Sequence, residues 1–463
     1  MAQDTDAGAA ARARHERLVA ADHRHLWHPF TQMQEWLEED PVVIESGDGV
    51  FLVDTLGRRY LDGVSSLWCN VHGHRVPEID RAVVEQLGRI AHTTLLGLAS
   101  TASIECAEAL VAVAPPGLTR VFFSDAGATA AEIALKMAYQ HFQLRGDLER
   151  KEFVAIRGGY HGDTIGSVSV GGIDLFHRIF KPLLFPVRHA PQPYCYRCPL
   201  GKEWPGCAMA CADEVERVFE AHAGKVAALV IEPLVQGADG MIVQPPGYLR
   251  RMREICDRHG ALLVCDEVAT GFGRTGTMFA VEQEGVRPDI LTVAKGLTGG
   301  YLPLAATLTT EQVFESFLGP FASRRTFFHG HTYTGNPLAC AAAVANLRLF
   351  RDRDVVAGLP AKGEALARAL EPLRSHPHVG EIRRRGLMVG IELVRDRATR
   401  EEYAFELRAG HQVTLEARRR GAILRPLGNV VVLMPPLAMT DGELSDLGRI
   451  TRESIEAAVA RLP

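Results

Sequence analysis

Short apolar runs alternate with amphipathic segments through the middle of the chain. The runs VAALVIEP (226–233), ALLVCDE (261–267) and PDILTVAKG (288–296) each have the length of a buried strand. Between the first two lies GYLRRMREICDRHG (247–260), whose apolar residues recur at helical spacing before a final glycine. Strands that alternate with helices form parallel sheets. The sequence therefore predicts an α/β fold with a mostly parallel central sheet.

A chain of 463 residues is too long for one simple domain. After residue 350 the pattern changes to strand-like runs with helices between and after them. We therefore expect residues 76–350 to form a large domain and residues 351–463 to form a smaller α+β domain. Residues 1–75 contain the predicted hairpin GVFLVDTLGRRYLDG (49–63) and are expected to join the small domain.

Charge and termini exclude several classes of protein. The net charge of −5 and the absence of a basic block argue against a nucleic-acid partner. The N-terminal stretch MAQDTDAGAAARARHERL has no apolar core, so it is not a signal peptide, and we expect a frayed leader. No apolar run approaches the roughly 18 residues of a membrane span. We expect a cytoplasmic protein without a membrane partner.

Nine cysteines, an odd number, argue for reduced thiols. Four of them, Cys195, Cys198, Cys207 and Cys211, cluster at spacings that leave two interpretations open: a structural zinc or iron–sulfur site, or free thiols in a loop. Histidine pairs in VHGH and FFHGHT are more typical of hydrogen-bonded loops than of metal ligands. We assign no metal.

Charged residues follow three of the predicted strands where each strand ends. They are Glu232, Asp266 and Lys295. Ligands of open parallel sheets bind beyond the carboxyl ends of the strands. A buried carboxylate needs a positive partner, so a simple salt bridge between Asp266 and Lys295 is the alternative to a ligand site.

A phosphate-sized site is available nearby. In SDAGATAAE, Gly127 and Ala128 lie in a turn between a predicted strand and a long helix, where backbone N–H groups and the helix dipole favour an anion. Tyr160, in GGYHGDT, supplies an aromatic ring. These parts match pyridoxal 5'-phosphate: Lys295 for a Schiff base, Asp266 for the pyridine nitrogen, the turn for the phosphate and Tyr160 for stacking.

Five longer motifs carry a resemblance to a known family. DEVATGFGRTG, TVAKGLTGGYLP, GYHGDT, IEPLVQGADGM and HGHTYTGNPLAC together resemble the class III aminotransferases of PLP fold type I, in the expected order over nearly the whole chain. The resemblance implies a large domain with a mostly parallel sheet, a smaller α+β domain, pyridoxal phosphate as cofactor and transamination as the reaction.

The resemblance also implies roles for single residues. Lys295 would bind the cofactor and shuttle the proton, and Asp266 would hold the ring nitrogen. Tyr160 and Val268 would cover the two faces of the ring. Gly127 and Ala128 would donate to the phosphate.

Further residues follow from the same motifs. Thr332 would reach the phosphate of the neighbouring subunit, which implies a homodimer with shared active sites. Glu232 would position or screen nearby positive charge. Gly330 would line the substrate site, and Arg425 would clamp the substrate carboxylate, because a planar guanidinium suits a carboxylate.

Three more stretches narrow the resemblance. HLWHPFTQM, SSLWCNVHGH and RPLGNVVVLMPPL are similar to the branch of the family that aminates 8-amino-7-oxononanoate in biotin biosynthesis. In that branch Phe30, Leu67 and Trp68 would line the substrate pocket, but many members have Tyr in place of Phe30 and Trp in place of Leu67. The amino donor is S-adenosylmethionine in most members and lysine in some. Fewer aromatic walls for a sulfonium favour lysine here.

Three alternatives remain. Within the family, another ω-aminotransferase acting on ornithine, 4-aminobutyrate or a polyamine fits the cofactor motifs equally well. GFGRTG (271–276) matches a dinucleotide fingerprint and would indicate an NAD-dependent dehydrogenase, although five residues separate it from the strand. A non-catalytic binding protein is the third alternative.

Overall fold

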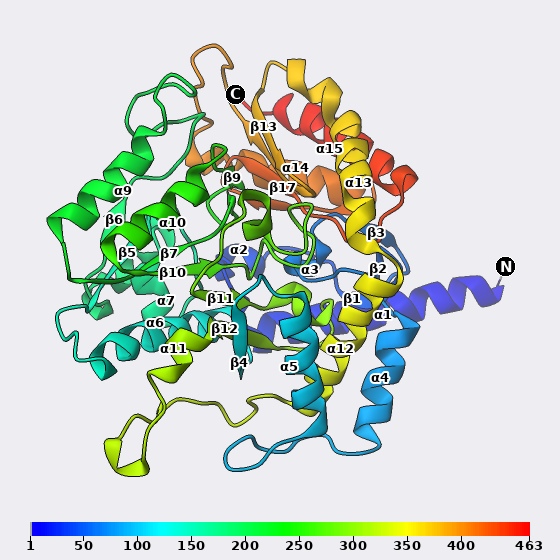
Figure 1. The fold of residues 1–463 in the computed structure, drawn as a ribbon. Helices are drawn as coiled ribbons and strands as arrows, with labels where there is room; N and C mark the ends of the chain where they lie inside the picture. Colours follow the sequence, from blue (N-terminus) through cyan, green and yellow to red (C-terminus); the bar gives the residue numbers. More distant parts are fainter. Residues whose placement is uncertain (1) are drawn as a thin grey trace.

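A seven-stranded sheet forms the centre of the larger part of the molecule (Figure 1). The structure, a computed structural model, describes residues 2–463, with side chains from residue 8 on. The strand order is β4-β12-β11-β10-β7-β5-β6. The strands are β4 (Leu118–Ser124), β5 (Glu152–Ile156), β6 (Arg188–Ala190), β7 (Val226–Ile231), β10 (Leu262–Asp266), β11 (Ile290–Val293) and β12 (Ala305–Thr310). Only β12 runs antiparallel to its neighbours, which confirms the predicted mostly parallel sheet.

Helices cover both faces of this sheet, which explains its continuous apolar strands. Along β7, Ala228 and Val230 pack on the face covered by α6 (Gly127–Leu144). Leu229 and Ile231 point to the opposite face, where α10 (Tyr248–His259) and α9 (Ala210–Ala221) pack. The helix expected at 247–260 is confirmed, and Gly260 follows it with a φ of 61°.

The C-terminal part contains a second, antiparallel sheet in the order β13-β14-β17-β16. Three helices accompany it, and a third sheet joins the N-terminal strands to β15 through parallel pairing with β3. The elements are β13 (Val379–Arg385), β14 (Met388–Leu393), β16 (Arg425–Leu427), β17 (Val430–Leu433), α13 (Val355–Leu370), α14 (Ala409–Arg419), α15 (Asp441–Val459), β1 (Ile44–Asp48), β2 (Phe51–Asp54), β3 (Arg59–Asp62) and β15 (Ala422–Ile423). The pairing supports the proposal that residues 1–75 join the small domain; the domain boundaries stay predictions.

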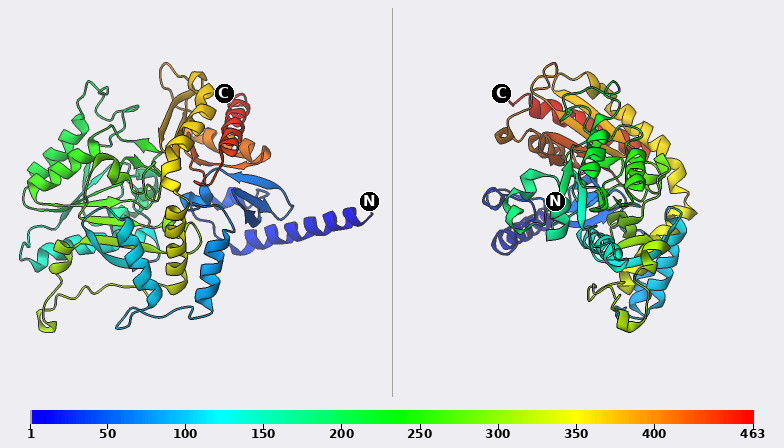
Figure 2. Two further views of the ribbon diagram at one scale, coloured as in Figure 1. Left: turned by 45° about the vertical axis from the view of Figure 1, so that its right-hand side comes forward. Right: turned by 60° about the vertical axis from the view of Figure 1, so that its left-hand side comes forward.

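Helix α12 (Pro337–Asp352) leads from the first part of the chain to the C-terminal part. It packs against α4 (Pro77–Leu87) and α5 (Thr101–Val113), and Figure 2 shows it running between the two parts. The buried amide of Asn346 donates to the carbonyls of Gly296 and Leu297, at 2.9 Å each. The helix thereby fixes the turn that follows β11.

Shorter elements complete the fold. They are α2 (Met33–Trp36), α3 (Ser65–Trp68), α7 (Ile165–Val170), α8 (Asp174–His177), α11 (Glu311–Glu315), β8 (Val235–Gln236) and β9 (Ile242–Val243). Among residues 2–463, no helix has both the length and the apolar character that crossing a membrane requires.

The expectation of a frayed N-terminal leader is wrong. Residues Ala2–His25 form helix α1, which projects from the body in Figure 2. Alanine has the highest helix propensity, and residues 7–14 are rich in it. His15 Nδ1 contacts Thr55 Oγ1 at 2.7 Å, and Arg14 pairs with Glu45 at 2.6 Å, so side chains attach the helix to the N-terminal strands.

The hydroxyl of Tyr248 is one of the buried hydroxyls that have no partner among the described residues. Tyr248 on α10 is completely buried, and its hydroxyl makes no hydrogen bond. We expect Tyr248→Phe to raise the free energy of unfolding by about 1 kcal/mol, because it removes an unpaired polar group. Tyr60→Phe is the control, since Tyr60 donates to Asp54 at 3.0 Å, and it should destabilise. Thermal unfolding midpoints measure both; a lower midpoint for Tyr248→Phe would contradict the prediction.

Candidate active site

Functional side chains gather at the carboxyl edge of the large sheet. Tyr160 follows β5, Glu232 follows β7, Asp266 ends β10 and Lys295 follows β11. The N-terminus of α6 follows β4, which runs in the same direction as these strands because β12 is antiparallel to both β4 and β11. The sheet topology therefore brings together the strand-end residues that the sequence singled out.

Asp266 is buried, and its carboxylate is held by three groups. Oδ2 lies 2.7 Å from Nδ1 of His161, while Oδ1 accepts from Thr292 Oγ1 at 3.1 Å and from the N–H of Val268 at 3.0 Å. Burial alone would lower the pKa of His161, but the hydrogen bond and charge of Asp266 raise it. Asp266 therefore has an imidazole partner, not the simple salt bridge to Lys295 considered from the sequence.

Sequence reasoning missed His161. Its signal was available, because His161 directly follows Tyr160 in GYHGDT at the end of a strand. Glu267, beside Asp266, accepts instead from the N–H groups of Ala280 and Val281 and from Thr270. Burial raises the pKa of Glu267 to about 7. Its hydrogen bonds hold the segment that follows the strand.

Lys295 is held in an unusual backbone conformation. Its φ is 43°, in the left-handed region that costs a non-glycine residue energy. Its Nζ lies 5.3 Å from the ring centre of Trp68, an attractive arrangement for an ammonium. Burial lowers the pKa of Lys295, against the charges of Asp266 and Glu232, which raise it. The amine can therefore exist as a free base more readily than an exposed lysine.

Glu232 connects two loops at the sheet edge. Its carboxylate accepts from the N–H of Tyr160 at 3.0 Å and from the N–H of Gly237 at 2.9 Å. Burial raises the pKa of Glu232 to about 7, although the charge of His161 and the Gly237 N–H act in the opposite direction. Glu232 thus fixes the backbone that presents Tyr160.

The turn before α6 is shaped to admit a bound group. The N–H groups of Gly127 and Ala128 have no hydrogen-bond partner among the described residues. A Cβ on Gly127 would lie 2.7 Å from Cγ1 of Val268, and one on Gly162 would lie 2.3 Å from Cβ of Ala128. These glycines therefore let three backbone segments approach closely around free donors at a helix N-terminus.

A cavity of about 660 Å³ is lined by Phe30 and Arg425. Phe30 packs edge-on against Phe176, at 5.3 Å between ring centres, and Phe176 packs against Tyr160 at 6.3 Å. Burial lowers the pKa of Arg425, while the nearby Tyr160 raises it. Two lining residues therefore lie near Tyr160, Phe30 through Phe176 and Arg425 through its charge, and Phe176 is a neighbour that the sequence did not indicate.

Three predicted site residues are exposed in the single chain. Leu67 is half exposed. Gly330 and Thr332 lie exposed on the segment before α12, and the carbonyl of Thr332 accepts from His92 Nε2 at 2.9 Å. His331 between them approaches Asp125 at 4.0 Å, next to the turn before α6. Within one chain the structure does not bring Thr332 to Lys295.

The four clustered cysteines line one small enclosed space of about 10 Å³. Burial raises the pKa of Cys195 and of Cys211 to about 11, which favours the thiol form. Among the residues that the structure describes, no group of three or more histidine, cysteine or acidic side chains is arranged to hold a metal ion. All nine cysteines are free thiols.

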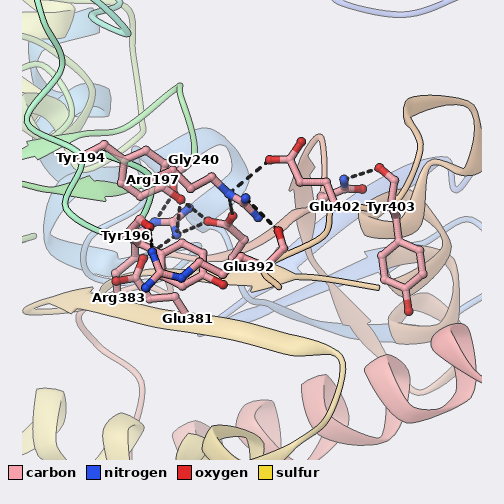
Figure 3. Close-up of polar contacts among 11 residues, drawn as sticks. Tyr194, Tyr196, Arg197, Gly240, Glu381, Arg383, Glu392, Glu402 and Tyr403 are labelled. Carbon is pink, nitrogen blue, oxygen red and sulfur yellow. Dashed lines mark hydrogen bonds and ion pairs between the residues drawn. The ribbon is translucent and has the colours of Figure 1, made fainter. Parts of the chain in front are cut away.

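A polar network links the cysteine loop to the C-terminal sheet (Figure 3). Arg383 on β13 and Arg197 in the loop both bond to Glu392 on β14, at 2.5 and 2.6 Å, and Tyr194 donates to the same carboxylate. Arg383 Nε also donates to the carbonyl of Gly240 at 2.8 Å. The network forms one side of the 660 Å³ cavity, and no motif in the sequence indicated it.

GFGRTG does not open a helix, so the dinucleotide interpretation is wrong. Residues 268–275 form successive turns after β10. Arg274 is buried there and donates to the carbonyls of Pro435 and Asn70, at 2.8 and 2.6 Å, and to Ser65. Burial lowers its pKa to about 10. The motif anchors the N-terminal loop and offers no helix N-terminus to a pyrophosphate.

The arrangement fits pyridoxal phosphate. It provides an amine on Lys295, a fixed carboxylate on Asp266 and an aromatic ring on Tyr160 beside the turn whose N–H groups are free. The aldehyde of the cofactor requires the amine, its ring nitrogen requires the carboxylate, and its phosphate requires the free N–H groups. The individual roles of these residues stay predictions.

We expect His161→Asn to destabilise the cofactor-free protein by about 2 kcal/mol at low pH, the value of a hydrogen bond between charged groups. A raised pKa stabilises the fold below the unfolded value of about 6.5, and this effect is lost as pH rises through the folded value. The loss of thermal stability should therefore be larger at about pH 6 than at about pH 9. His72→Asn is the control, because burial lowers the pKa of His72 to about 4 and its cost should not grow toward pH 6. A pH-independent loss for His161→Asn would contradict the pairing.

Comparisons with known proteins agree on one family. A family model described as aminotransferase class III matches residues 33–455. Adenosylmethionine-8-amino-7-oxononanoate aminotransferase of Nitratidesulfovibrio vulgaris is 59% identical over 449 residues, 96% of this chain and 83% of that protein. The crystal structure of the enzyme of that name from Methanocaldococcus jannaschii has a TM-score of 0.91 at 44% identity, covering 96% of this chain and 99% of the other. An omega transaminase from Pseudomonas jessenii in complex with PMP also has a TM-score of 0.91, at 30% identity, covering 96% and 99% of the two chains. The chain therefore belongs to the class III aminotransferases, which depend on pyridoxal phosphate.

Proposed function

We propose that this aminotransferase converts 8-amino-7-oxononanoate to 7,8-diaminononanoate in biotin biosynthesis, with S-adenosylmethionine or lysine as the amino donor. The names of the N. vulgaris and M. jannaschii relatives support the acceptor. The observation that carries the proposal is the cavity lined by Phe30 and Arg425, because it offers a cationic end, beside Tyr160, to a substrate with an apolar body.

Arg425 is suited to bind the carboxylate of this substrate. Its side chain makes no ion pair with the described residues, and its Nε is buried without a hydrogen bond. Burying a guanidinium without a partner is costly, so a ligand carboxylate would recover a large part of that energy. The carbon chain of the substrate would lie in the cavity beside Phe30.

Pyridoxal phosphate, when bound, supplies a ring that takes up the electron pair of the carbon next to the transferred amine. Lys295, with its lowered pKa, takes a proton at Nζ and returns it. Asp266, oriented by His161 and Thr292, presents a fixed negative charge. Tyr160 and Val268 exclude water from the two faces of the site.

The first test separates the two half-reactions. The holoenzyme is mixed with lysine or S-adenosylmethionine alone, and the absorbance of the cofactor is followed from its aldehyde to its amine form. We expect one donor to convert it and 8-amino-7-oxononanoate to convert it back. Lys295→Ala should slow both steps by about a thousandfold or more, because it removes the proton carrier.

Lys151→Ala is the control for that variant, since Lys151 is an exposed lysine, and it should leave both steps unchanged. Conversion by ornithine or 4-aminobutyrate, with no return by 8-amino-7-oxononanoate, would replace the proposal with another ω-aminotransferase activity. The omega transaminases among the similar structures make this the second candidate.

We further propose that the enzyme is a homodimer whose subunits share active sites. Two segments expose an unusual number of large apolar side chains, which marks an interaction surface. They are Val84, Leu87, Ile90, Leu96, Leu98, Leu318, Phe321, Phe328 and Tyr333. Gly330 and Thr332 lie on the second segment, so a partner seated here would receive them at its own site.

Subunit mixing tests the shared site. A mixed dimer of Lys295→Ala and Thr332→Ala chains would hold one site with both defects and one site with neither. We expect the mixture, at limiting cofactor, to exceed the summed activity of the two parents. Thr310→Ala is the control partner, because Thr310 caps α11 away from this segment, and mixing it with Lys295→Ala should give no gain beyond the sum. If the mixture of Thr332→Ala and Lys295→Ala chains shows only the summed activity of the two parents, the subunits do not share their sites through Thr332.

A further inference from the structure

Most charged side chains around the 660 Å³ cavity are paired with one another. Arg408 pairs with Glu35, and His411 lies 4.0 Å from Glu39. The network of Figure 3 uses the others: Arg383 pairs with Glu381 and Glu392, and Arg197 pairs with Glu392 and Glu402. The charges of these groups are balanced by one another, so they do not require a charged ligand.

Three lining groups have no ion-pair partner among the described residues: Arg418, Arg425 and Asp239. Asp239 is the acidic one. Its Oδ2 accepts from the amide of Gln192 at 2.7 Å, and this neutral donor is its hydrogen-bond partner. Burial raises the pKa of Asp239 to about 6, although Gln192 and the charge of Arg383 act in the opposite direction. Arg383 is itself balanced by two carboxylates, so Asp239 still lacks a cation.

The turn that carries Asp239 lies near Trp68 on one side and near strand β17 on the other. Asp239 lies in the turn between β8 and β9, and two residues earlier a Cβ on Gly237 would lie 3.2 Å from the Trp68 ring, which contacts Lys295. One residue later, a Cβ on Gly240 would lie 3.2 Å from Val430 of β17. Strand β17 pairs with β16, which begins at Arg425. The turn therefore lies between the ring beside Lys295 and the sheet that carries Arg425.

Glycine also lets the Asp239 carboxylate pack closely against the backbone. A Cβ on Gly158 would lie 2.5 Å from Oδ2 of Asp239 and 2.0 Å from the Gln192 amide. Gly158 precedes the loop of Tyr160 by two residues. The carboxylate is thus seated against the backbone of the Tyr160 loop, and no group of described residues around it could hold a metal ion instead of an ammonium.

We propose that Asp239 binds a second ammonium group on the amino donor, next to the donor carboxylate that Arg425 binds. The ligand class is a diamino monocarboxylic acid, whose distal amine reacts at Lys295 while its amino acid head pairs with Asp239 and Arg425. A half-buried carboxylate and a half-buried guanidinium that each lack an ion-pair partner are both costly, and one zwitterionic head would pair with both. The inference rests on the proposed function and selects lysine between its two donors.

Two amines that differ by one group test the assignment. Lysine and 6-aminohexanoate share the reacting amine and the carboxylate, but 6-aminohexanoate lacks the second ammonium. Each is mixed with the holoenzyme, and the half-reaction is followed by the cofactor absorbance over a range of amine concentrations. In Asp239→Asn we expect the half-saturating lysine concentration to rise about 30-fold, the value of a hydrogen bond between charged groups. The value for 6-aminohexanoate should stay the same.

Matched variants control for structural damage. Glu402→Gln removes another acid from the same cavity, but Glu402 already pairs with Arg197 at 3.2 Å, so the preference for lysine should be unchanged. Asp239→Glu keeps the charge and should retain part of the preference. The thermal midpoint and the cofactor absorbance of each holoenzyme report whether it is folded and loaded.

Three outcomes would overturn the inference: equal losses for lysine and 6-aminohexanoate in Asp239→Asn, an unchanged lysine value in that variant, or a wild-type enzyme that reacts with S-adenosylmethionine but not with lysine. The acceptor reports separately on the proposed function. If the amine form of the cofactor fails to react with 8-amino-7-oxononanoate while lysine selectivity depends on Asp239, the proposed function fails and the ammonium site stands. If the acceptor reacts but lysine selectivity does not depend on Asp239, the proposed function stands and the ammonium site fails.

Discussion

The fixed carboxylate of Asp266 is the constraint around which the site is built. A buried anion at the end of a central strand is tolerable only if nearby groups hold it, and here an imidazole, a hydroxyl and a backbone N–H do so. Each donor comes from a different part of the sheet edge: His161 follows β5, Thr292 lies on β11 and Val268 follows β10. The strands β5, β10 and β11 must therefore run parallel, with their carboxyl ends at one edge, for this one group to be stable.

Sequence patterns predict the parts of this structure that depend on local chemistry. Continuous apolar runs identify β7, β10 and β11, and the charged residue after each run marks the sheet edge where the site forms. Small residues at Gly127 and Ala128 indicate the turn with free N–H groups because that property is a backbone property. The GFGRTG stretch misleads because glycine spacing alone does not say whether a helix follows.

Contacts between distant segments are the part that the sequence could not supply. Asp239 and Glu392 are both acidic residues in the sequence. In the structure, Asp239 lacks a cation, whereas Glu392 is bound by two arginines and a tyrosine. Such differences arise only when the cysteine loop, the β8–β9 turn and the C-terminal sheet meet. The alanine-rich start of the chain is a similar case, because the contacts of Arg14 and His15 attach α1 to the body.

Helix α12 gives the molecule a mechanical property. Its 16 residues span about 24 Å at 1.5 Å per residue, from the exposed segment of Thr332 to the start of the C-terminal part. In the C-terminal half of the helix, Asn346 donates hydrogen bonds to the carbonyls of Gly296 and Leu297, the two residues that follow Lys295. A helix is stiff along its axis, so a displacement of the C-terminal part is transmitted to the backbone of Lys295. Helix α12 thus couples the position of the C-terminal part of the enzyme to the backbone conformation of Lys295.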